Sequence, residues 1–224
     1  MPSRTPALLA AALLAGVVNV AAAFLGMDPL ARVAQWLYLP PLALALVQSG
    51  WLHTRLSRWW LAGLALCWLG DGLGWLGFEV LLGLFLLGHV AYLVGLLPTW
   101  RRSWALRPRG LLHVALLVVG LLLVAPLAGS LVAVVVAYGI VLTAVALLAT
   151  AAGWPGVAGG LLFMVSDLSL AWLRFSGSDL GDGWRSLVVI GTYVPAQALL
   201  LVGVLRLGTR HPHAEERSAR RSTA

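Results

Sequence analysis

Residues 110–152 read GLLHVALLVVGLLLVAPLAGSLVAVVVAYGIVLTAVALLATAA, without a single acidic residue, arginine or lysine. An α-helix needs about 20 apolar residues to cross roughly 30 Å of hydrocarbon, because each residue adds about 1.5 Å. The stretch is therefore long enough for two crossings, and Gly129 supplies a break between them. Polar and apolar residues do not alternate along it, so helices are predicted in preference to barrel strands.

Apolar runs of similar length recur on both sides of this stretch. The predicted spans are residues 7–25, 33–52, 59–77, 79–97, 110–128, 130–152, 154–173 and 184–205. Very short joins at Gly77, Gly129 and Gly153 imply antiparallel neighbours. We predict an all-α polytopic membrane protein, an eight-transmembrane-helix bundle that forms a single domain over residues 1–205. Residues 206–224 are predicted to be a polar, disordered cytoplasmic tail.

The composition excludes an ordinary soluble domain. The chain is 61% hydrophobic and 10% charged, whereas soluble domains carry about 25% charged residues. Its single cysteine, Cys67, cannot form an intrachain disulfide. All 15 basic residues are arginines that flank the apolar runs, so no nucleic-acid partner is expected. The arginine-only basic set and the abundant Ala, Gly, Leu and Val favour a protein of the bacterial inner membrane.

The arginines also predict the orientation. If the N-terminus is cytoplasmic, only Arg32, Arg174 and Arg185 of the 15 arginines lie on the outer side. Because positive charge concentrates on the cytoplasmic side of membrane proteins, both termini are predicted to be cytoplasmic. Arg4 and the alanines at 21–23 also fit a cleavable signal peptide, but the first apolar run exceeds the usual length of about 7–15 residues.

Ionisable residues inside the predicted spans mark a candidate site. Asp71, His89 and Asp167 are such residues, and burying them in a membrane is costly unless they face the bundle interior. The helix rise places Asp71 and Asp167 roughly 18–20 Å from the inner edge of the membrane. His89, Tyr138 and Tyr193 fall in the same slab, slightly outward of the midplane. We therefore predict that these side chains form one site.

Further polar candidates are Asn19, Tyr92, Ser166 and Gln197. Each polar residue also has a structural interpretation, as a hydrogen-bonding partner in helix packing. A catalytic zinc site needs three protein ligands, and only His89 shares the depth of the two aspartates, so no metal is expected. A Ser-His-Asp nucleophile is disfavoured because Ser166 points about 100° away from its neighbour Asp167 on a helix.

At these segments the chain resembles the YhhN family of eight-span membrane proteins, whose characterised members include lysoplasmalogenases. The matching stretches are CWLGD at 67–71, GLFLLGHVAY at 83–92, GLLFMVSD at 160–167 and YVPAQ at 193–197. Three features depart from the family pattern. Cys67 stands where serine is frequent, a methionine usual in the sixth span is replaced around residues 143–145, and WLYLPP at 36–41 replaces a Lys-Pro pair. The resemblance implies a phosphate or site contact for that lysine, and Arg32, about one turn earlier on the same predicted helix, is a candidate replacement.

The resemblance implies a hydrolase acting on ether bonds. Its substrate would be a lysoplasmalogen, a lysophospholipid whose vinyl ether is cleaved to a fatty aldehyde and glycerophospho-ethanolamine or -choline. This chemistry needs an acid and a base, and Asp71 and Asp167 are the hypothetical pair, with their roles left open. The residues expected to orient water and substrate are His89, Tyr92, Tyr138, Ser166, Tyr193, Gln197 and Asn19. No cofactor is expected.

Two other functions remain open at this stage. The same aspartates could hydrolyse a different lipid. Alternatively, a helical bundle with polar groups near its midplane could bind a lipid or transport a proton or small solute without covalent chemistry. No inverted repeat is evident, although Pro40-Pro41 and Pro195 could kink two spans. The expected partners are membrane lipids and a lysophospholipid substrate, while the oligomeric state is left open.

Overall fold

A computed structural model describes residues 4–210, and every regular element among them is helical. The α-helices are α1 (Thr5–Phe24), α2 (Asp28–Leu37), α3 (Leu39–Gln48), α4 (Arg55–Leu73), α5 (Phe78–Leu96), α6 (Leu111–Val124), α7 (Val132–Ala149), α8 (Trp154–Phe175) and α9 (Asp182–Arg210). The 3₁₀-helices are η1 (Gly74–Leu76), η2 (Leu97–Arg102), η3 (Trp104–Leu106), η4 (Pro108–Gly110), η5 (Ala125–Leu127), η6 (Gly129–Leu131) and η7 (Thr150–Ala152). The all-α prediction is confirmed. Helix α9 extends five residues beyond the predicted end of the last span, and residues 211–224 of the predicted tail lie outside the described residues.

Seven helical segments in the described part of the chain are long and apolar enough to cross a membrane. They are Thr5–Phe24, Asp28–Gln48, Phe78–Arg102, Pro108–Leu127, Gly129–Ala152, Trp154–Phe175 and Asp182–Gly208. The remaining predicted span corresponds to α4, which has 19 residues but does not meet this composition. Its sequence carries Arg55, Arg58 and Asp71, and these charges make it more polar than the other seven segments.

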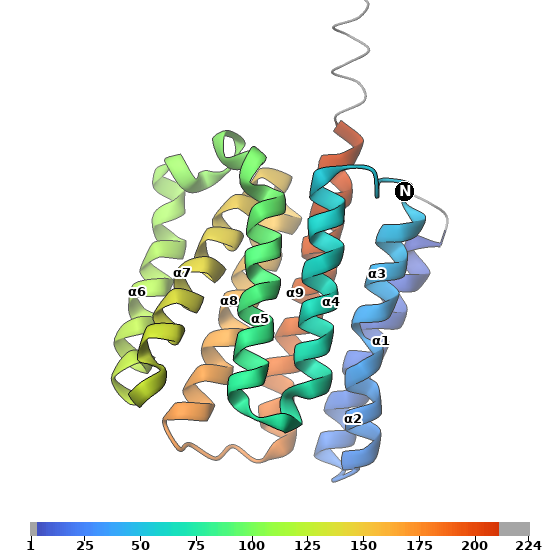
Figure 1. The fold of residues 1–224 in the computed structure, drawn as a ribbon. Helices are drawn as coiled ribbons and strands as arrows, with labels where there is room; N and C mark the ends of the chain where they lie inside the picture. Colours follow the sequence, from blue (N-terminus) through green and yellow to red (C-terminus); the bar gives the residue numbers. More distant parts are fainter. Residues whose placement is uncertain (1–3, 211–224) are drawn as a thin grey trace, which may run out of the picture.

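The helices stand side by side in one bundle (Figure 1). The most extensive contacts join α8 to α9 and α4 to α5, and α1 packs against both α2 and α9. The start of α1 and the end of α9 lie at the same end of the bundle (Figure 1). Helix α4 runs alongside its neighbours in the same bundle (Figure 1).

The second predicted span is broken at Tyr38, between α2 and α3. Proline has no backbone N–H, so Pro40 and Pro41 fit the first turn of α3 but cannot continue the hydrogen bonds of α2. The carbonyl of Trp36 would bond to the N–H of residue 40 in a continuous helix. Here it accepts a hydrogen bond from Nε1 of Trp68 at 3.0 Å, which ties the break to α4.

Close approach of α4 and α5 depends on glycine. A Cβ atom at Gly88 would lie 2.8 Å from Sγ of Cys67, so a larger residue would push these two helices apart. Gly160 likewise allows α7 and α8 to approach closely, because a Cβ atom at this position would lie 3.0 Å from Ala146. Small residues commonly allow such contacts between helices in membranes. These contacts hold in place the helices that carry the candidate site.

Candidate active site

Asp71 lies near the C-terminal end of α4, and only 8% of it is exposed. Oη of Tyr193, on α9, donates a hydrogen bond to Oδ2 of Asp71 at 3.0 Å. Nε2 of Gln35, on α2, donates to the backbone carbonyl of Asp71 at 2.9 Å. The hydroxyl of Tyr38 is buried near the same carboxyl and near the side chain of Gln35. Three separate segments therefore converge on Asp71.

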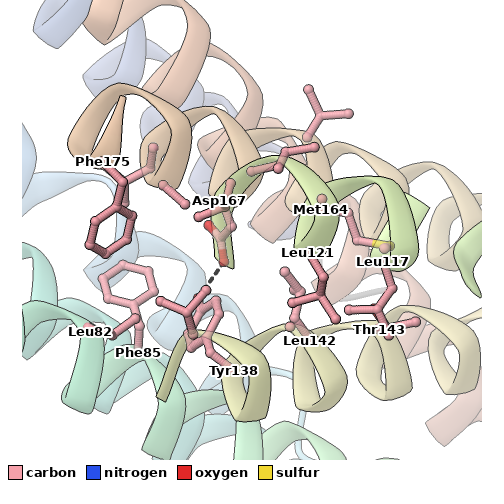
Figure 2. Close-up of a pocket in the computed structure, with 18 of the residues that line it drawn as sticks. Leu82, Phe85, Leu117, Leu121, Tyr138, Leu142, Thr143, Met164, Asp167 and Phe175 are labelled. Atoms are coloured by element: carbon pink, nitrogen blue, oxygen red, sulfur yellow. Dashed lines mark hydrogen bonds between the residues drawn. The ribbon is translucent and has the colours of Figure 1, made fainter. Parts of the chain in front are cut away.

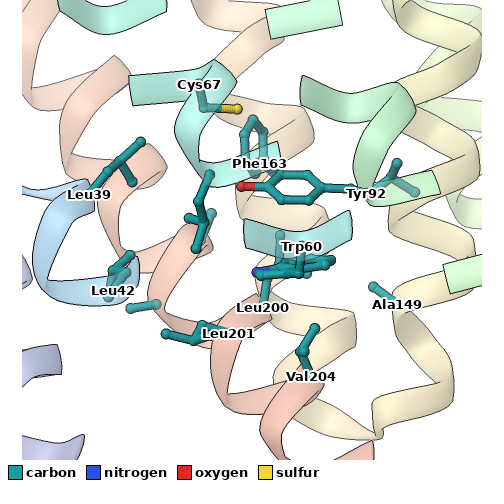
Figure 3. Packing of buried hydrophobic residues seen from close by; sticks show 14 of the residues in the cluster. Leu39, Leu42, Trp60, Cys67, Tyr92, Ala149, Phe163, Leu200, Leu201 and Val204 are labelled. Carbon is teal, nitrogen blue, oxygen red and sulfur yellow. The ribbon is translucent and has the colours of Figure 1, made fainter. Parts of the chain in front are cut away.

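The Asp71 network continues through Gln197. This side chain lies one turn after Tyr193 on α9, a spacing that puts both residues on one helix face. Its Nε2 donates to Oη of Tyr193 at 3.4 Å, and its Oε1 accepts from Oη of Tyr92 at 3.0 Å. The Tyr92 ring is stacked on Trp60, with a centroid distance of 4.0 Å (Figure 3). Packing thus fixes the amide, which in turn orients the hydroxyl that faces Asp71.

A second network surrounds Asp167 on α8, which is 9% exposed. Tyr138 of α7 donates a hydrogen bond to Oδ2 of Asp167 (Figure 2). On α5, Nδ1 of His89 lies 2.8 Å from the carbonyl oxygen of Phe85 and 3.5 Å from Oη of Tyr138. Because a carbonyl can only accept, Nδ1 carries the hydrogen in this arrangement. Nε2 of His89 is buried and has no partner in the described part of the chain.

Aromatic rings connect the two networks. The Phe163 ring packs edge-on against His89, with a centroid distance of 4.7 Å, and against Tyr193 at 5.3 Å. Asp71 and Asp167 share no hydrogen bond, but they are near enough to interact electrostatically.

An apolar cavity opens beside Asp167, between α5, α6, α7 and α8. Its volume is about 100 Å³, and Asp167 is the single carboxylate in its lining (Figure 2). Tyr138 and Phe85 also line it, whereas Asp71 does not. The volume of this cavity is smaller than that of most small-molecule sites, which is about 300–1,000 Å³. A lipid chain could enter only if the surrounding side chains, such as Leu117 on α6, moved aside.

A larger polar cavity of about 490 Å³ lies between α1, α2 and α9. Its polar lining residues are Asn19, Asp28, Arg32, Gln35, Asp182, Arg185 and Ser186. Leu170 of α8 lines both cavities, so they are neighbours. Gln35 connects this cavity to the backbone of Asp71. Asp167 thus lines the apolar cavity, and the backbone of Asp71 is joined through Gln35 to the polar cavity.

The structure divides the predicted site residues into four groups. Asp71, Tyr92, Tyr193 and Gln197 form one network, and His89, Tyr138 and Asp167 form the other. Oγ of Ser166 instead donates to the carbonyl of Val189 at 3.0 Å and joins α8 to α9. Asn19 lines the polar cavity, away from both carboxyls. Neither Ser166 nor Asn19 belongs to either network.

Gln35 and Tyr38 are contacts of Asp71 that the sequence did not single out. Gln35 is an uncharged polar residue near the start of a predicted span, where it attracts little notice. The adjacent prolines could have drawn attention to both residues, because proline interrupts the hydrogen bonds of a helix and marks a break next to them. No group of three or more His, Cys, Asp or Glu side chains suited to a metal ion occurs among residues 4–210.

Comparisons with known proteins give a family but no close relative. Neither a curated protein nor a solved structure matches the chain. The model of the YhhN family matches residues 27–204, which include α2 to α8, both aspartates and most of α9. The match covers most of the 224 residues, and the chain therefore belongs to the YhhN family.

Proposed function

We propose that this protein is a lysoplasmalogenase-like hydrolase, which cleaves the vinyl ether of a lysophospholipid. The observation that carries the proposal is a pair of buried carboxyls, of which Asp167 lines the apolar cavity and Asp71 is joined through its backbone and Gln35 to the polar cavity. A lysophospholipid has the same division, with a hydrocarbon chain on one side of the vinyl ether and a polar headgroup on the other. Membership of the YhhN family supports the same activity.

The reaction starts with protonation of the vinyl carbon farther from the ether oxygen. This leaves an oxocarbenium ion, in which the carbon bonded to oxygen is electrophilic. Water attacks that carbon while a base removes one of its protons, and the product is a hemiacetal. When the hemiacetal collapses, the bond from this carbon to the glycerol oxygen breaks. That oxygen takes up a proton and the hemiacetal hydroxyl gives one up, so one water is consumed in all.

We assign the acid role to Asp167 and the base role to Asp71. Asp167 lines the apolar cavity, where the hydrocarbon chain and its vinyl carbons would lie. Asp71 is joined through Gln35 to the polar cavity, from which water can approach. In the collapse step, Asp71 returns its proton to the leaving glycerol oxygen, and Asp167 accepts the proton of the hydroxyl. Both carboxyls then regain their starting states.

The tyrosines fix the directions of these proton transfers. Tyr193 occupies one oxygen of Asp71 and Tyr138 occupies one oxygen of Asp167, which leaves the other oxygen of each carboxyl for the reaction. Oxygens held in this way need little reorganisation in the transition state, and such preorganisation contributes strongly to catalysis. His89 supports Tyr138, while Gln197 supports Tyr193.

For the membrane arrangement, we propose eight crossings, with α4 as the eighth, and cytoplasmic termini. The start of α1 and the end of α9 lie at the same end of the bundle, which supports an even number (Figure 1). A polar helix such as α4 is tolerated inside a bundle because its neighbours cover it. The arginine bias supports the orientation, and the composition supports placement in a bacterial inner membrane.

The test is aldehyde release by the purified protein. We expect fatty aldehyde from lysoplasmenyl-ethanolamine and none from the lysolipid with a saturated alkyl ether, because only a vinyl ether can be protonated on carbon. Asp71→Asn and Asp167→Asn should abolish release while the protein remains folded. Heat-inactivated protein at the same pH controls for spontaneous hydrolysis, since vinyl ethers are acid-labile. Release of fatty acid from an ester lysolipid, without aldehyde from the vinyl ether, would instead favour hydrolysis of another lipid.

A further inference from the structure

The polar cavity carries four charged side chains from two helices. Asp28 and Arg32 lie four residues apart on α2, and Asp182 and Arg185 lie three apart on α9. Ion pairs form readily at both spacings on a helix. None of the four side chains is in an ion pair among the described residues. The cavity thus presents two positive and two negative groups that are available to a ligand.

Hydrogen bonds of Asn19 hold the walls of this cavity together. Its Nδ2 donates to the carbonyl of Ala31 on α2 at 2.7 Å, and its Oδ1 accepts from Oγ of Ser186 on α9 at 2.7 Å. Asn19 belongs to α1 and is 5% exposed. One buried amide therefore joins three helices, and the two charged helices keep a fixed separation. Such rigid support is what a binding site for a small polar group requires.

The size and charge of the cavity indicate what it can hold. A volume of about 490 Å³ falls within the usual range of about 300–1,000 Å³ for small-molecule sites. Guanidinium groups bind phosphate oxygens through parallel hydrogen bonds, while carboxylates pair with ammonium groups. A ligand with only a phosphate would leave the two carboxylates beside its negative charge. A ligand with both a phosphate and a cationic amine satisfies both kinds of side chain.

We propose that this cavity binds a zwitterionic phosphodiester headgroup, with the phosphate on Arg32 and Arg185 and the amine on Asp28 and Asp182. The inference rests on the proposed function for one point, which is that the hydrocarbon chain enters the apolar cavity beyond Leu170. The vinyl ether then lies between the two cavities, near both aspartates.

Binding of an ester-linked lysophosphatidylethanolamine to the purified full-length protein tests the proposal without any need for turnover. Arg32→Gln and Arg185→Gln should each weaken binding about tenfold, as expected for loss of a charge-assisted hydrogen bond. Arg174→Gln is the matched control. Arg174 lies over the Phe78 ring and is outside the cavity lining, so its loss should leave affinity unchanged. Thermal unfolding in detergent checks that each variant is folded.

The carboxylates are tested through the amine. Asp28→Asn and Asp182→Asn should weaken binding of lysophosphatidylethanolamine but not of lysophosphatidic acid, which has no amine. Soluble glycerophosphoethanolamine should compete with lysophosphatidylethanolamine better than glycerol 3-phosphate does. Because neither compound has a hydrocarbon chain, this comparison shows whether the headgroup is recognised on its own. Equal binding by wild type and both arginine variants would overturn the proposal. So would equal effects of the aspartate variants on the two lipids, or equal competition by the two soluble compounds.

This experiment can fail independently of the proposed reaction. Headgroup-selective binding without aldehyde release would contradict the hydrolase while leaving the headgroup site intact. Aldehyde release that is unaffected by Arg32→Gln and Arg185→Gln would contradict the headgroup site while leaving the hydrolase intact.

Discussion

Replacement of Tyr193 by Phe removes the hydroxyl that donates to Asp71 and accepts from Nε2 of Gln197, and it keeps the aromatic ring. The ring remains packed against Tyr38, Phe85 and Phe163, whose centroids lie 5.8, 5.7 and 5.3 Å away. A hydrogen bond to a charged group contributes about 1.5–3 kcal/mol. If that amount is lost from the transition state, kcat/KM for aldehyde release should fall roughly 13- to 160-fold.

Two neighbouring substitutions calibrate this effect. Oη of Tyr92 donates to the neutral amide of Gln197, so Tyr92→Phe should cost about 0.5–1.5 kcal/mol, or roughly 2- to 13-fold in kcat/KM. Oγ1 of Thr192 donates to backbone carbonyls of its own helix, and Thr192→Val therefore removes a hydroxyl adjacent to Tyr193 without touching the network. Its activity should stay within about twofold of wild type.

The assay is steady-state aldehyde release in detergent micelles of fixed lipid fraction, with thermal unfolding measured in parallel. The expected order of activity is wild type and Thr192→Val, then Tyr92→Phe, then Tyr193→Phe. A folded Tyr193→Phe protein with wild-type kcat/KM would refute the role given to this hydroxyl. A loss in Thr192→Val as large as that in Tyr193→Phe would show that the effect is general to α9 and not specific to Asp71.

Three further predictions test the apolar cavity, the polar cavity and the membrane arrangement. Gly120→Leu should reduce turnover of long-chain substrates because Gly120 lines the apolar cavity, whereas Gly83→Leu, at a site with no neighbour within 4 Å, should not; equal losses would contradict this. Asn19→Ala should lower the free energy of unfolding by about 1–3 kcal/mol through loss of two hydrogen bonds, measured as a lower Tm, and an unchanged Tm would contradict the role of Asn19 in joining α1, α2 and α9. The variants His53→Cys and Trp75→Cys place a thiol on either side of α4. The two thiols should react with an impermeant maleimide from opposite sides of the membrane, whereas labelling from one side would exclude α4 as a crossing. The natural cysteine is fully buried and should not react.

The sequence predicts the helices well because apolar length alone decides them in a membrane. The break near Pro40 was also predictable, since the chemistry of proline is local. Apolar composition identifies α4 less clearly than the other long helices. Asp71, which belongs to the candidate site, lowers the mean hydropathy of this helix together with Arg55 and Arg58. Composition thus identifies the bundle most easily where the helices carry the fewest functional groups.

The candidate site was predictable only in part. Depth along a helix can be counted from the sequence, and it placed Asp71 and Asp167 in one slab. Tyr193 and Gln197 lie four residues apart in the sequence and so share a helix face, and the two side chains are hydrogen-bonded. Which tyrosine pairs with which aspartate depends on how each helix is rotated, and sequence periodicity does not determine this when every face is apolar. Helix rotation also explains why Asn19 was grouped with the other polar candidates. Its side chain lines the polar cavity and belongs to neither aspartate network.

The measurement that tests the central claim most directly is the mass of the aldehyde released from lysoplasmenyl-ethanolamine in D₂O. Protonation of the vinyl carbon by an enzyme acid that exchanges with solvent predicts one deuterium on the carbon next to the aldehyde group, after trapping by reduction. Wild-type protein should release this singly labelled aldehyde, and Asp71→Asn and Asp167→Asn should release none. Failure of the folded wild-type protein to release aldehyde, or labelled aldehyde from both aspartate variants at the wild-type rate, would contradict the account.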